Sequence, residues 1–541
     1  MASLVLLPAE LIRLVFIEFV PDALEVNAPV SDIVKHKQNR ATLRAAILTC
    51  RYFRDEVTPL LYRHTLVTTG IQCARLCGTL LAQPALRPEI KTFSSLVNLI
   101  SSREYAVAAD HFKHNVVYPT TEAPLLPEAL DHDTSQIISR AGITFDKTSD
   151  LIQKLMVKRD ENDGSPNPFL QRAVGLILIL SPKLENVLLR YPPDDSPPIY
   201  WDLSEMGNML QNYESSGKPF LVSVQTLRFE DYPLVRKTAL PSGATSTVDD
   251  DAMLPLLRLP NLKRTDMHRP VVRWIQSYLD APNHQAPGLL TEITDLRVTG
   301  MEKTSVYIYD LLRRCKKLSR LVWTFQQSPL WENTIDDVLA PAKETLRDLH
   351  LESLPRDPYA FTRPNDGNGW NDMFAFFEHL QEAHVFRQVT CLATFKHLQS
   401  LKIDLMTLLG PRYRDRLFRF DLDLVSLLPP NLKRLELIEV SLNDIFKDNY
   451  HVAAHDEWFC RYLLWFASSC SSRMPHLQKF IFHARRPVPK NIGVNTRLRH
   501  VSFIRLLAMR FHEAGIELNW VWQDKLALGI YYPKRVLSGT A

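Results

Sequence analysis

Apolar residues recur along the chain at two spacings, one typical of helices and one typical of strands. Near the N-terminus, Leu11, Val15 and Phe19 follow one another at helical spacing. From Leu184 onward, short phrases of the form Leu-x-x-Leu-x-Leu end in a strict alternation of apolar and polar residues. Such alternation is typical of a short strand with one buried face. The pattern predicts an α/β protein with helices first and strand–helix units afterwards.

The Leu-x-x-Leu-x-Leu phrase occurs ten times, with other residues replacing some of the leucines. Segments between the phrases often have helical spacing, so each phrase predicts a strand followed by a helix. A strand–helix unit cannot bury its apolar face alone, and neighbouring units must therefore stack into a parallel sheet. The phrases are Leu184-Val187-Leu189, Val224-Leu227-Phe229, Leu262-Thr265-Met267, Ile293-Leu296-Val298, Leu318-Leu321-Trp323, Leu346-Leu349-Leu351, Leu398-Leu401-Ile403, Leu432-Leu435-Leu437, Leu477-Phe480-Phe482 and Leu498-Val501-Phe503.

This recurrence resembles a leucine-rich repeat, although an irregular one. Leucine-rich repeats are typically about 20–29 residues long and carry an Asn or Cys after the second strand leucine. Only three of the nine steps between phrases, of 25, 28 and 21 residues, fit that window, and the Asn ladder is missing. The resemblance implies a leucine-rich-repeat-like solenoid. The alternative is an ordinary α/β domain in which the phrase marks core strands.

Three short helices are predicted before residue 66. Leu7-Pro8-Ala9-Glu10 predicts a helix start, because proline suits the first helical position and Glu10 complements the helix dipole. A second helix is predicted from about Ala41 to Phe53, and a third from about Arg54 to Tyr62. Pro59 is expected to bend or restart the third helix. Three such helices barely bury a core alone, so the module is expected to lean on a neighbour or a partner.

The same residues resemble an F-box of the kind common in fungal proteins. The matching features are Leu7-Pro8-x-Glu10-Leu11-Ile12, the Val15-Phe16 pair, Leu48-Thr49-Cys50-Arg51-Tyr52-Phe53 and Pro59-Leu60-Leu61-Tyr62-Arg63. They cover about 60 residues of the 541. The chain departs from the family pattern at residues 21–40, where a short loop is usual. This insertion is expected to form a surface loop.

Membership of the F-box family implies a partner, the Skp adaptor of cullin–RING ubiquitin ligases. The resemblance also implies which apolar residues enter the adaptor's groove. A rigid Leu-Pro at a helix entrance loses little entropy on docking. The alternative is that these residues form only the internal core of a helical cap. The implied adaptor-binding residues are Leu7, Pro8, Leu11, Ile12, Leu48, Cys50 and Phe53.

The expected organisation has three parts. Residues 1–68 form the F-box, residues 69–180 a mostly helical linker or capping region, and residues 181–541 the leucine-rich-repeat-like substrate-recognition domain. Within the middle part, Thr134 to Val157 and Phe169 to Leu180 are the predicted helices.

Composition narrows the class of protein. Hydrophobic residues make up 45% and charged residues 23% of the chain, as in globular proteins. The net charge of +4 does not favour a nucleic-acid partner. Seven scattered cysteines favour reduced thiols. The sequence shows no membrane-spanning run and no convincing signal peptide. The protein is expected in the cytoplasm, the nucleus or both, and not to be secreted.

Motifs for catalysis are missing from the sequence. It has no GxxxxGK[ST], GxGxxG, GxSxG or HExxH, so neither an enzyme nor a cofactor is expected. Cys73 and Cys77 could share one helix face, but a zinc site needs three or four ligands and no second pair follows. Two buried structural thiols are the prediction there. His451, His455 and Cys460 are interpreted as a satisfied or solvent-facing group, and no metal is expected.

The C-terminal end is basic. Between residues 471 and 541, twelve Lys and Arg stand against three acidic residues. Arg485, Arg486 and Lys490 are a possible substrate-binding patch for an acidic or phosphorylated segment, since Arg forms bidentate pairs with such groups. The alternative is a solvated basic cap.

These observations lead to one functional hypothesis and one alternative. The chain is expected to be the substrate-recognition subunit of an SCF-type cullin–RING ubiquitin ligase, binding a Skp adaptor through the F-box and a protein substrate through the solenoid. It would act by raising the effective concentration of the substrate near the ubiquitin-charged enzyme. The alternative is a leucine-rich-repeat scaffold that never enters a ligase.

Overall fold

The computed structural model describes the chain in fifteen segments, separated by gaps. The first third of the chain includes the three N-terminal helices, and the last third includes the longest helices. The described residues are 8–21, 30–68, 70–95, 130–143, 168–190, 204–217, 220–230, 254–268, 290–301, 305–326, 334–354, 389–409, 423–438, 452–485 and 494–523.

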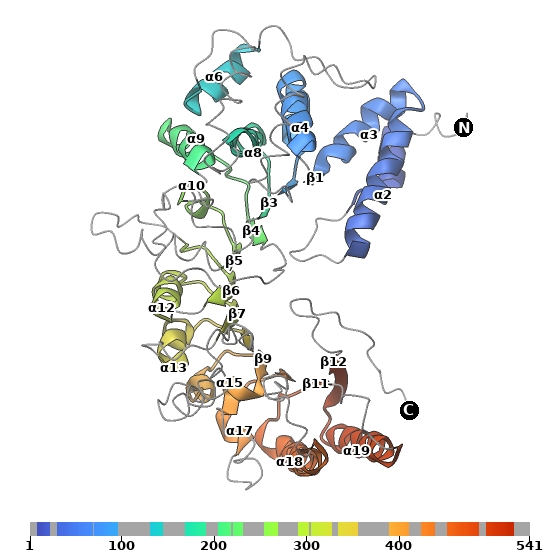
Figure 1. The fold of residues 1–541 in the computed structure, drawn as a ribbon, viewed down its shortest axis with the longest axis vertical. Coiled ribbons are helices and arrows are strands. Elements are labelled where there is room, and N and C mark those ends of the chain that lie inside the picture. The colour runs from blue at the N-terminus through green and yellow to red at the C-terminus, as the bar shows by residue number, and fades with distance from the viewer. Residues whose placement is uncertain are drawn as a thin grey trace, which may run out of the picture. The chain divides into compact units, whose positions relative to one another are not determined.

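Two compact units make up the chain, Met1–Glu292 and Ile293–Ala541. Both are α/β units with parallel sheets, as the alternating patterns predict (Figure 1). The division lies at Glu292. The described residues of the middle part, 69–180, are mostly helical and include one strand, Thr92–Ser95, which joins the sheet of the first unit.

The first unit begins with three helices, α1 (Ala9–Ile17), α2 (Val30–Ile47) and α3 (Arg51–Arg63). Three helices are present as predicted, but the predicted boundary between the second and the third, between Phe53 and Arg54, is wrong. Cys50 lies outside α2 and caps α3, with its Sγ accepting a hydrogen bond from the Phe53 N–H at 3.4 Å. The expectation that residues 21–40 form a surface loop is also wrong for residues 30–40, which belong to α2.

These helices share a small core of their own. Ile12 of α1, Leu43 of α2 and Phe53 of α3 are buried in it, and Phe16 packs its ring against the Phe53 ring edge to face, with centroids 5.5 Å apart. An ion pair of 2.6 Å between Arg13 and Glu56 adds to the contact of α1 with α3. α3 continues through Pro59 to Arg63.

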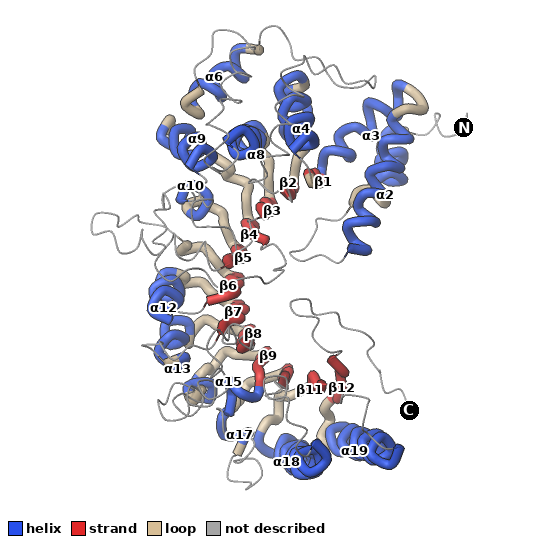
Figure 2. The backbone as a smooth tube through the Cα atoms, in the orientation of Figure 1, coloured by secondary structure: helices blue, strands red, loops and turns tan. Residues whose placement is uncertain are grey.

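In the described part of the first unit, five parallel strands follow, and their order in the sheet is their order in the chain. Helices α4, α8, α9 and α10 lie in a row along one side of these strands (Figure 2). The elements are β1 (His64–Val67), α4 (Gly70–Ala82), the 3-10 helix η2 (Pro84–Glu89), β2 (Thr92–Ser95), α6 (His132–Arg140), α8 (Pro168–Leu180), β3 (Asn186–Arg190), α9 (Ser204–Ser215), β4 (Thr226–Glu230), α10 (Leu254–Leu257) and β5 (Arg264–His268).

The second unit repeats this arrangement, with seven strands among its described residues, again in chain order. Its labelled helices lie along one side of the strands (Figure 2). The elements are β6 (Asp295–Met301), α12 (Ser305–Arg314), β7 (Arg320–Gln326), α13 (Ile335–Leu339), the 3-10 helix η5 (Ala340–Ala342), β8 (Asp348–Leu354), the 3-10 helix η7 (Cys391–Thr394), β9 (Ser400–Asp404), α15 (Leu405–Leu409), α17 (Leu424–Leu427), β10 (Arg434–Ile438), α18 (Val452–Arg473), β11 (Lys479–Arg485), α19 (Val494–Glu513) and β12 (Glu517–Gln523).

Nine of the ten Leu-x-x-Leu-x-Leu phrases coincide with strands β3 to β11, and all three marked positions of each are buried. The strand register aligns the phrases with one another. In the second unit, Leu401 of β9 pairs with Leu435 of β10, which pairs with Phe480 of β11. Equivalent positions therefore stack side by side into one continuous row of the core.

The prediction of a strand at the tenth phrase is wrong. Leu498, Val501 and Phe503 lie in helix α19, where Leu507 and Phe511 are buried four residues apart at helical spacing. The helix ends at Glu513, and Gly515 in the turn that follows has a positive φ of 73°, which suits glycine. The Ile516 N–H donates to the Phe511 carbonyl at 2.8 Å. The strand comes after this turn, as β12, and pairs in parallel with β11.

A repeated backbone contact precedes the strands. The carbonyl of the residue just before one strand accepts two consecutive N–H groups at the start of the next. Thr294 accepts from Ser319 and Arg320, each at 2.9 Å, and Gln399 accepts from Lys433 at 2.7 Å and Arg434 at 3.0 Å. This contact aligns the first residues of neighbouring strands.

Among the described residues, no helix is both long and apolar enough to cross a membrane.

Candidate functional site

Helix α1 has two apolar faces, and only one of them is used by the core. Ile12 and Phe16 lie four residues apart and pack inward. Leu11, Leu14 and Val15 are spaced i, i+3, i+4 and form an outward stripe, which remains exposed. An apolar stripe left in water is unfavourable by roughly 25 cal/mol per Å² of accessible surface. The outward stripe therefore gains free energy if another protein covers it.

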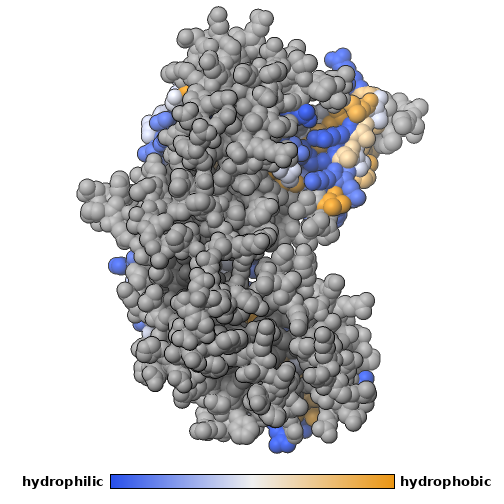
Figure 3. Space-filling model, viewed as in Figure 1, coloured by the Kyte–Doolittle hydropathy of each residue, from blue (hydrophilic) through white to orange (hydrophobic). Residues whose placement is uncertain are grey.

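Exposed apolar side chains concentrate in the N-terminal helices. Seven of the eleven large exposed hydrophobic residues in the described part of the chain lie between residues 11 and 48. In Figure 3, hydrophobic side chains emerge among hydrophilic ones over these helices. We call these seven residues the N-terminal apolar surface; they are Leu11, Leu14, Val15, Ile17, Phe19, Val34 and Leu48.

The residues expected to bind an adaptor divide into two groups. Pro8, Leu11 and Leu48 are exposed, and Cys50 is half-buried. Ile12 and Phe53 are buried between the helices, so they support the surface from below and do not form part of it. Leu7 lies outside the described residues.

Sequence reasoning missed several members of the N-terminal apolar surface. Leu14 and Val15 complete the outward stripe, and Leu14 is 60% exposed. The sequence carries the signal for this, because an α-helix of nine residues with large apolar residues at six positions, 11, 12, 14, 15, 16 and 17, is too apolar for a one-sided helix.

Two basic residues of α2, His36 and Arg40, are buried or half-buried. His36 is buried, and burial, reinforced by the positive charges of Arg40 and His64, lowers the pKa of His36 to about 4. Arg40 donates from Nη1 to the Leu66 carbonyl at 3.0 Å, which ties α2 to β1. Burial also lowers the pKa of Arg40 to about 10. A neutral His36 is thus part of the packing that holds α2 in place.

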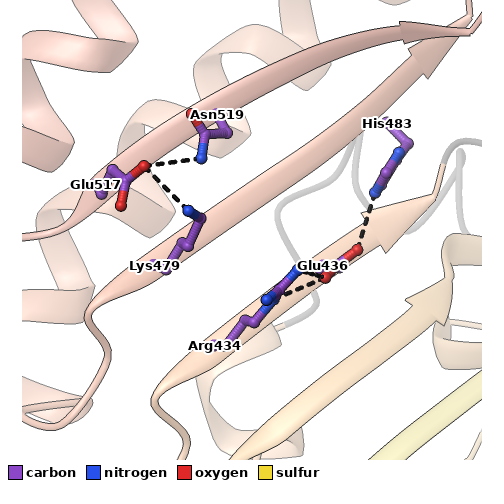
Figure 4. A network of polar contacts seen from close by, with 6 residues as sticks. All are labelled: Arg434, Glu436, Lys479, His483, Glu517 and Asn519. Atoms are coloured by element: carbon purple, nitrogen blue, oxygen red, sulfur yellow. Dashed lines mark hydrogen bonds and ion pairs between the residues drawn. The ribbon is translucent and has the colours of Figure 1, made fainter. Parts of the chain in front are cut away.

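A second candidate surface is the face of the second unit's sheet that points away from the helices. Figure 4 shows Glu436 of β10 between Arg434 on its own strand and His483 of β11. Arg434 donates from Nε to the Glu436 carboxylate at 2.7 Å, and His483 Nε2 lies 3.0 Å from the other carboxylate oxygen. Next to them, Glu517 accepts hydrogen bonds from Lys479 at 3.1 Å and from Asn519 at 2.9 Å (Figure 4).

This network keeps Glu436 ionised. Burial by itself would raise the pKa of the carboxyl group. Hydrogen bonds from His483 and Arg434 and the nearby charge of Lys402 outweigh burial and lower the pKa of Glu436 to about 2. The carboxylate therefore carries its charge at every physiological pH, and its oxygens are already engaged.

The basic patch expected at the C-terminal end is described only in part. Arg485 is the last residue of β11, two residues beyond His483 on the same strand. The Arg485 side chain lies outside the described residues. Arg486 and Lys490 lie outside the described residues.

The cysteines of α4 are buried as expected. Burial raises the pKa of Cys77 to about 12 and also raises the pKa of Cys73, which keeps both as thiols. Within the described segments, no group of three or more His, Cys, Asp or Glu side chains could hold a metal ion. The side chains of His451, His455 and Cys460 lie outside the described residues.

Comparisons with protein-family models, with curated proteins and with solved structures found no match to this chain. The N-terminal apolar surface and the polar face of the second unit are the two surfaces of the described residues that point to a function.

Proposed function

We propose that this protein is the substrate-recognition subunit of an SCF-type ubiquitin ligase. In this proposal its N-terminal helices form an F-box that binds a Skp adaptor. The strand–helix units form an irregular leucine-rich-repeat-like solenoid that binds a protein substrate. The chain itself performs no covalent chemistry and acts by bringing the substrate close to the ubiquitin-charged enzyme.

The observation that carries the proposal is the position of the N-terminal apolar surface. Leu11, Leu14 and Val15 form a stripe on a helix whose opposite side is already packed. Fully burying an aliphatic side chain of this size contributes roughly 1.5–3 kcal/mol, so a stripe of three supplies several kcal/mol to an interface. The stripe falls within the segment whose sequence resembles an F-box.

The buried residues hold helix α1 in place, so that its outward stripe is ordered before any partner binds. Ile12 and Phe53 anchor α1 onto α3, so the outward stripe is held on a packed support. A surface that is already ordered before binding loses less conformational entropy on docking. The adaptor contact is therefore assigned to Pro8, Leu11, Leu14, Val15 and Leu48.

The proposal is tested by co-expression of the full chain with a Skp adaptor, followed by pull-down. The test variant is Leu11→Ala with Leu14→Ala, and the matched control is Leu506→Ala with Met509→Ala on α19. The two pairs have similar exposure, 46% and 60% against 43% and 60%. We expect the native chain and the control to retain the adaptor and the test variant to lose most of it.

Failure of the folded native chain to retain any adaptor would contradict the proposal. The same observations would then favour the second candidate function, a leucine-rich-repeat scaffold outside any ligase. In that case the N-terminal apolar surface would bind a different protein.

A further inference from the structure

The strands β9, β10 and β11 expose cations and bury carboxylates on the face turned away from the helices. Lys402, Arg434 and Lys479 are exposed or half-buried there. Asp404 and Glu436, the carboxylates of these strands, are buried. Exposed carboxylates flank this region at Asp348 on β8 and at Glu517 on β12. The exposed and half-buried charged groups between these flanks therefore belong to lysine and arginine.

The buried carboxylates are engaged within the protein. Asp404 accepts hydrogen bonds from the Thr407 N–H at 2.8 Å and from the Thr407 hydroxyl at 2.6 Å. Glu436 accepts from Arg434 and lies within hydrogen-bond distance of His483. These contacts engage both oxygens of each carboxylate within the protein.

Lys402 is in a different situation. Its register partners are His350 on β8 and Glu436 on β10, so it lies on the middle strand of three. Within the described segments its ammonium makes neither a hydrogen bond nor an ion pair, although its charge lowers the pKa of Glu436. An ammonium has three donors, and an unfilled one in a half-buried setting binds an anion well.

We infer that the face of β9, β10 and β11 binds a short acidic peptide segment of the substrate protein, with the Lys402 ammonium contacting a substrate carboxylate. This inference rests on the proposed function for the identity of the partner as a ligase substrate. The dimensions fit such a segment. Three adjacent strands span about 10 Å, and an extended peptide of three or four residues covers that width at about 3.3 Å per residue.

A carboxylate suits this surface better than a phosphate group. Phosphate recognition favours the bidentate fork of an arginine. The fork of Arg434 is already committed to Glu436 through Nε and Nη2. The remaining donor in the centre of the face is the point charge of Lys402, which pairs with a carboxylate without that geometry.

The test uses the full chain and fluorescein-labelled peptides, with fluorescence polarisation as the readout. One peptide has three consecutive glutamates between Gly-Ser flanks. A second has glutamines in their place, and a third carries phosphoserine at the central position. The protein variants are Lys402→Glu and the neutral Lys402→Gln, and the matched control is Lys316→Glu at an exposed lysine beyond α12 of the same unit. Circular dichroism and adaptor pull-down are recorded on each preparation.

We expect saturable binding of the glutamate peptide that weakens as salt is raised, since exposed charge pairs are screened. Binding should fall about tenfold or more for the glutamine peptide and for Lys402→Glu, and by a smaller factor for Lys402→Gln. Lys316→Glu should remain within about twofold of the native chain. These ratios follow from the loss of a charge-assisted hydrogen bond.

Three results would overturn the inference: no saturable binding by the folded native chain, equal losses in Lys402→Glu and Lys316→Glu, or binding of the phosphoserine peptide about tenfold tighter than the glutamate peptide. If the native chain binds the adaptor but not the glutamate peptide, this inference is contradicted and the proposed function is not. Peptide binding without adaptor binding would support the acidic-peptide site and contradict the ligase assignment.

Discussion

Leu11 and Ile12 are neighbours in helix α1, yet Leu11 is 46% exposed and Ile12 is 1% exposed. Adjacent residues of an α-helix point about 100° apart, so one helix can serve a core and a surface at once. Ile12 packs among Leu43, Phe53 and Val57, while Leu11 belongs to the N-terminal apolar surface. The two residues separate the structural role of α1 from its proposed role in binding.

This separation predicts opposite effects of two similar substitutions. Ile12→Ala removes a buried side chain and should cost about 2–5 kcal/mol of local stability, because it leaves a cavity between the helices. Leu11→Ala should change stability by only about 0.5 kcal/mol. Hydrogen exchange of the amides in α3 measures both effects. Faster exchange in Leu11→Ala than in Ile12→Ala would contradict the assignment of the two faces.

A second pair of neighbours tests the sheet of the second unit. Leu401 is buried in the row shared with Leu435, and Lys402 points to the opposite face. Leu401→Ala should destabilise the unit by about 2–5 kcal/mol, whereas Lys402→Ala should have an effect near zero. Urea unfolding followed by tryptophan fluorescence provides the measurement. Equal midpoints for the two variants would show that Leu401 does not belong to the core.

The buried His36 predicts a pH dependence of the N-terminal helices. The pKa of His36 is lowered from 6.5 to about 4 in the folded state, so the unfolded chain binds a proton more readily. The stability that neutral His36 contributes is therefore complete above about pH 6.5 and is lost as the pH falls towards 4. Hydrogen exchange of α2 at pH 7.5 and pH 5, corrected for the intrinsic rate, should show this loss.

His36→Gln should reduce that pH dependence, because glutamine does not titrate. The exposed His512→Gln serves as the control and should leave it unchanged. An identical pH response in the native chain and in His36→Gln would rule out His36 as its source.

The strands were largely predictable because the repeated phrase encodes register as well as burial. Positions such as Leu321 and Leu349 recur at the same place in each phrase and pair directly across β7 and β8. The phrase failed where helical spacing also satisfied it, at Leu498 in α19. It also missed β1 and β2, which are four residues long. At the two strand positions of the phrase they carry Thr65 and Val67, and Phe93 and Ser95, in place of leucines.

The helix boundaries and the surface of α1 were harder to predict. Residues 30–40 include Lys35, Lys37 and Asn39, which are polar enough to suggest a loop, but tertiary packing through His36 and Arg40 extends the helix over them. For α1, both Leu11 and Ile12 are apolar, so the pattern could not show which one faces outward. That distinction depends on where α3 lies.

The central claim is that the N-terminal apolar surface binds a Skp adaptor, and hydrogen–deuterium exchange of the full chain with and without purified adaptor tests it most directly. The account predicts slower exchange in residues 9–17 and around Leu48 when the adaptor is added, with no change in β9, β10 and β11. No change in α1 at saturating adaptor, or protection confined to the second unit, would contradict it.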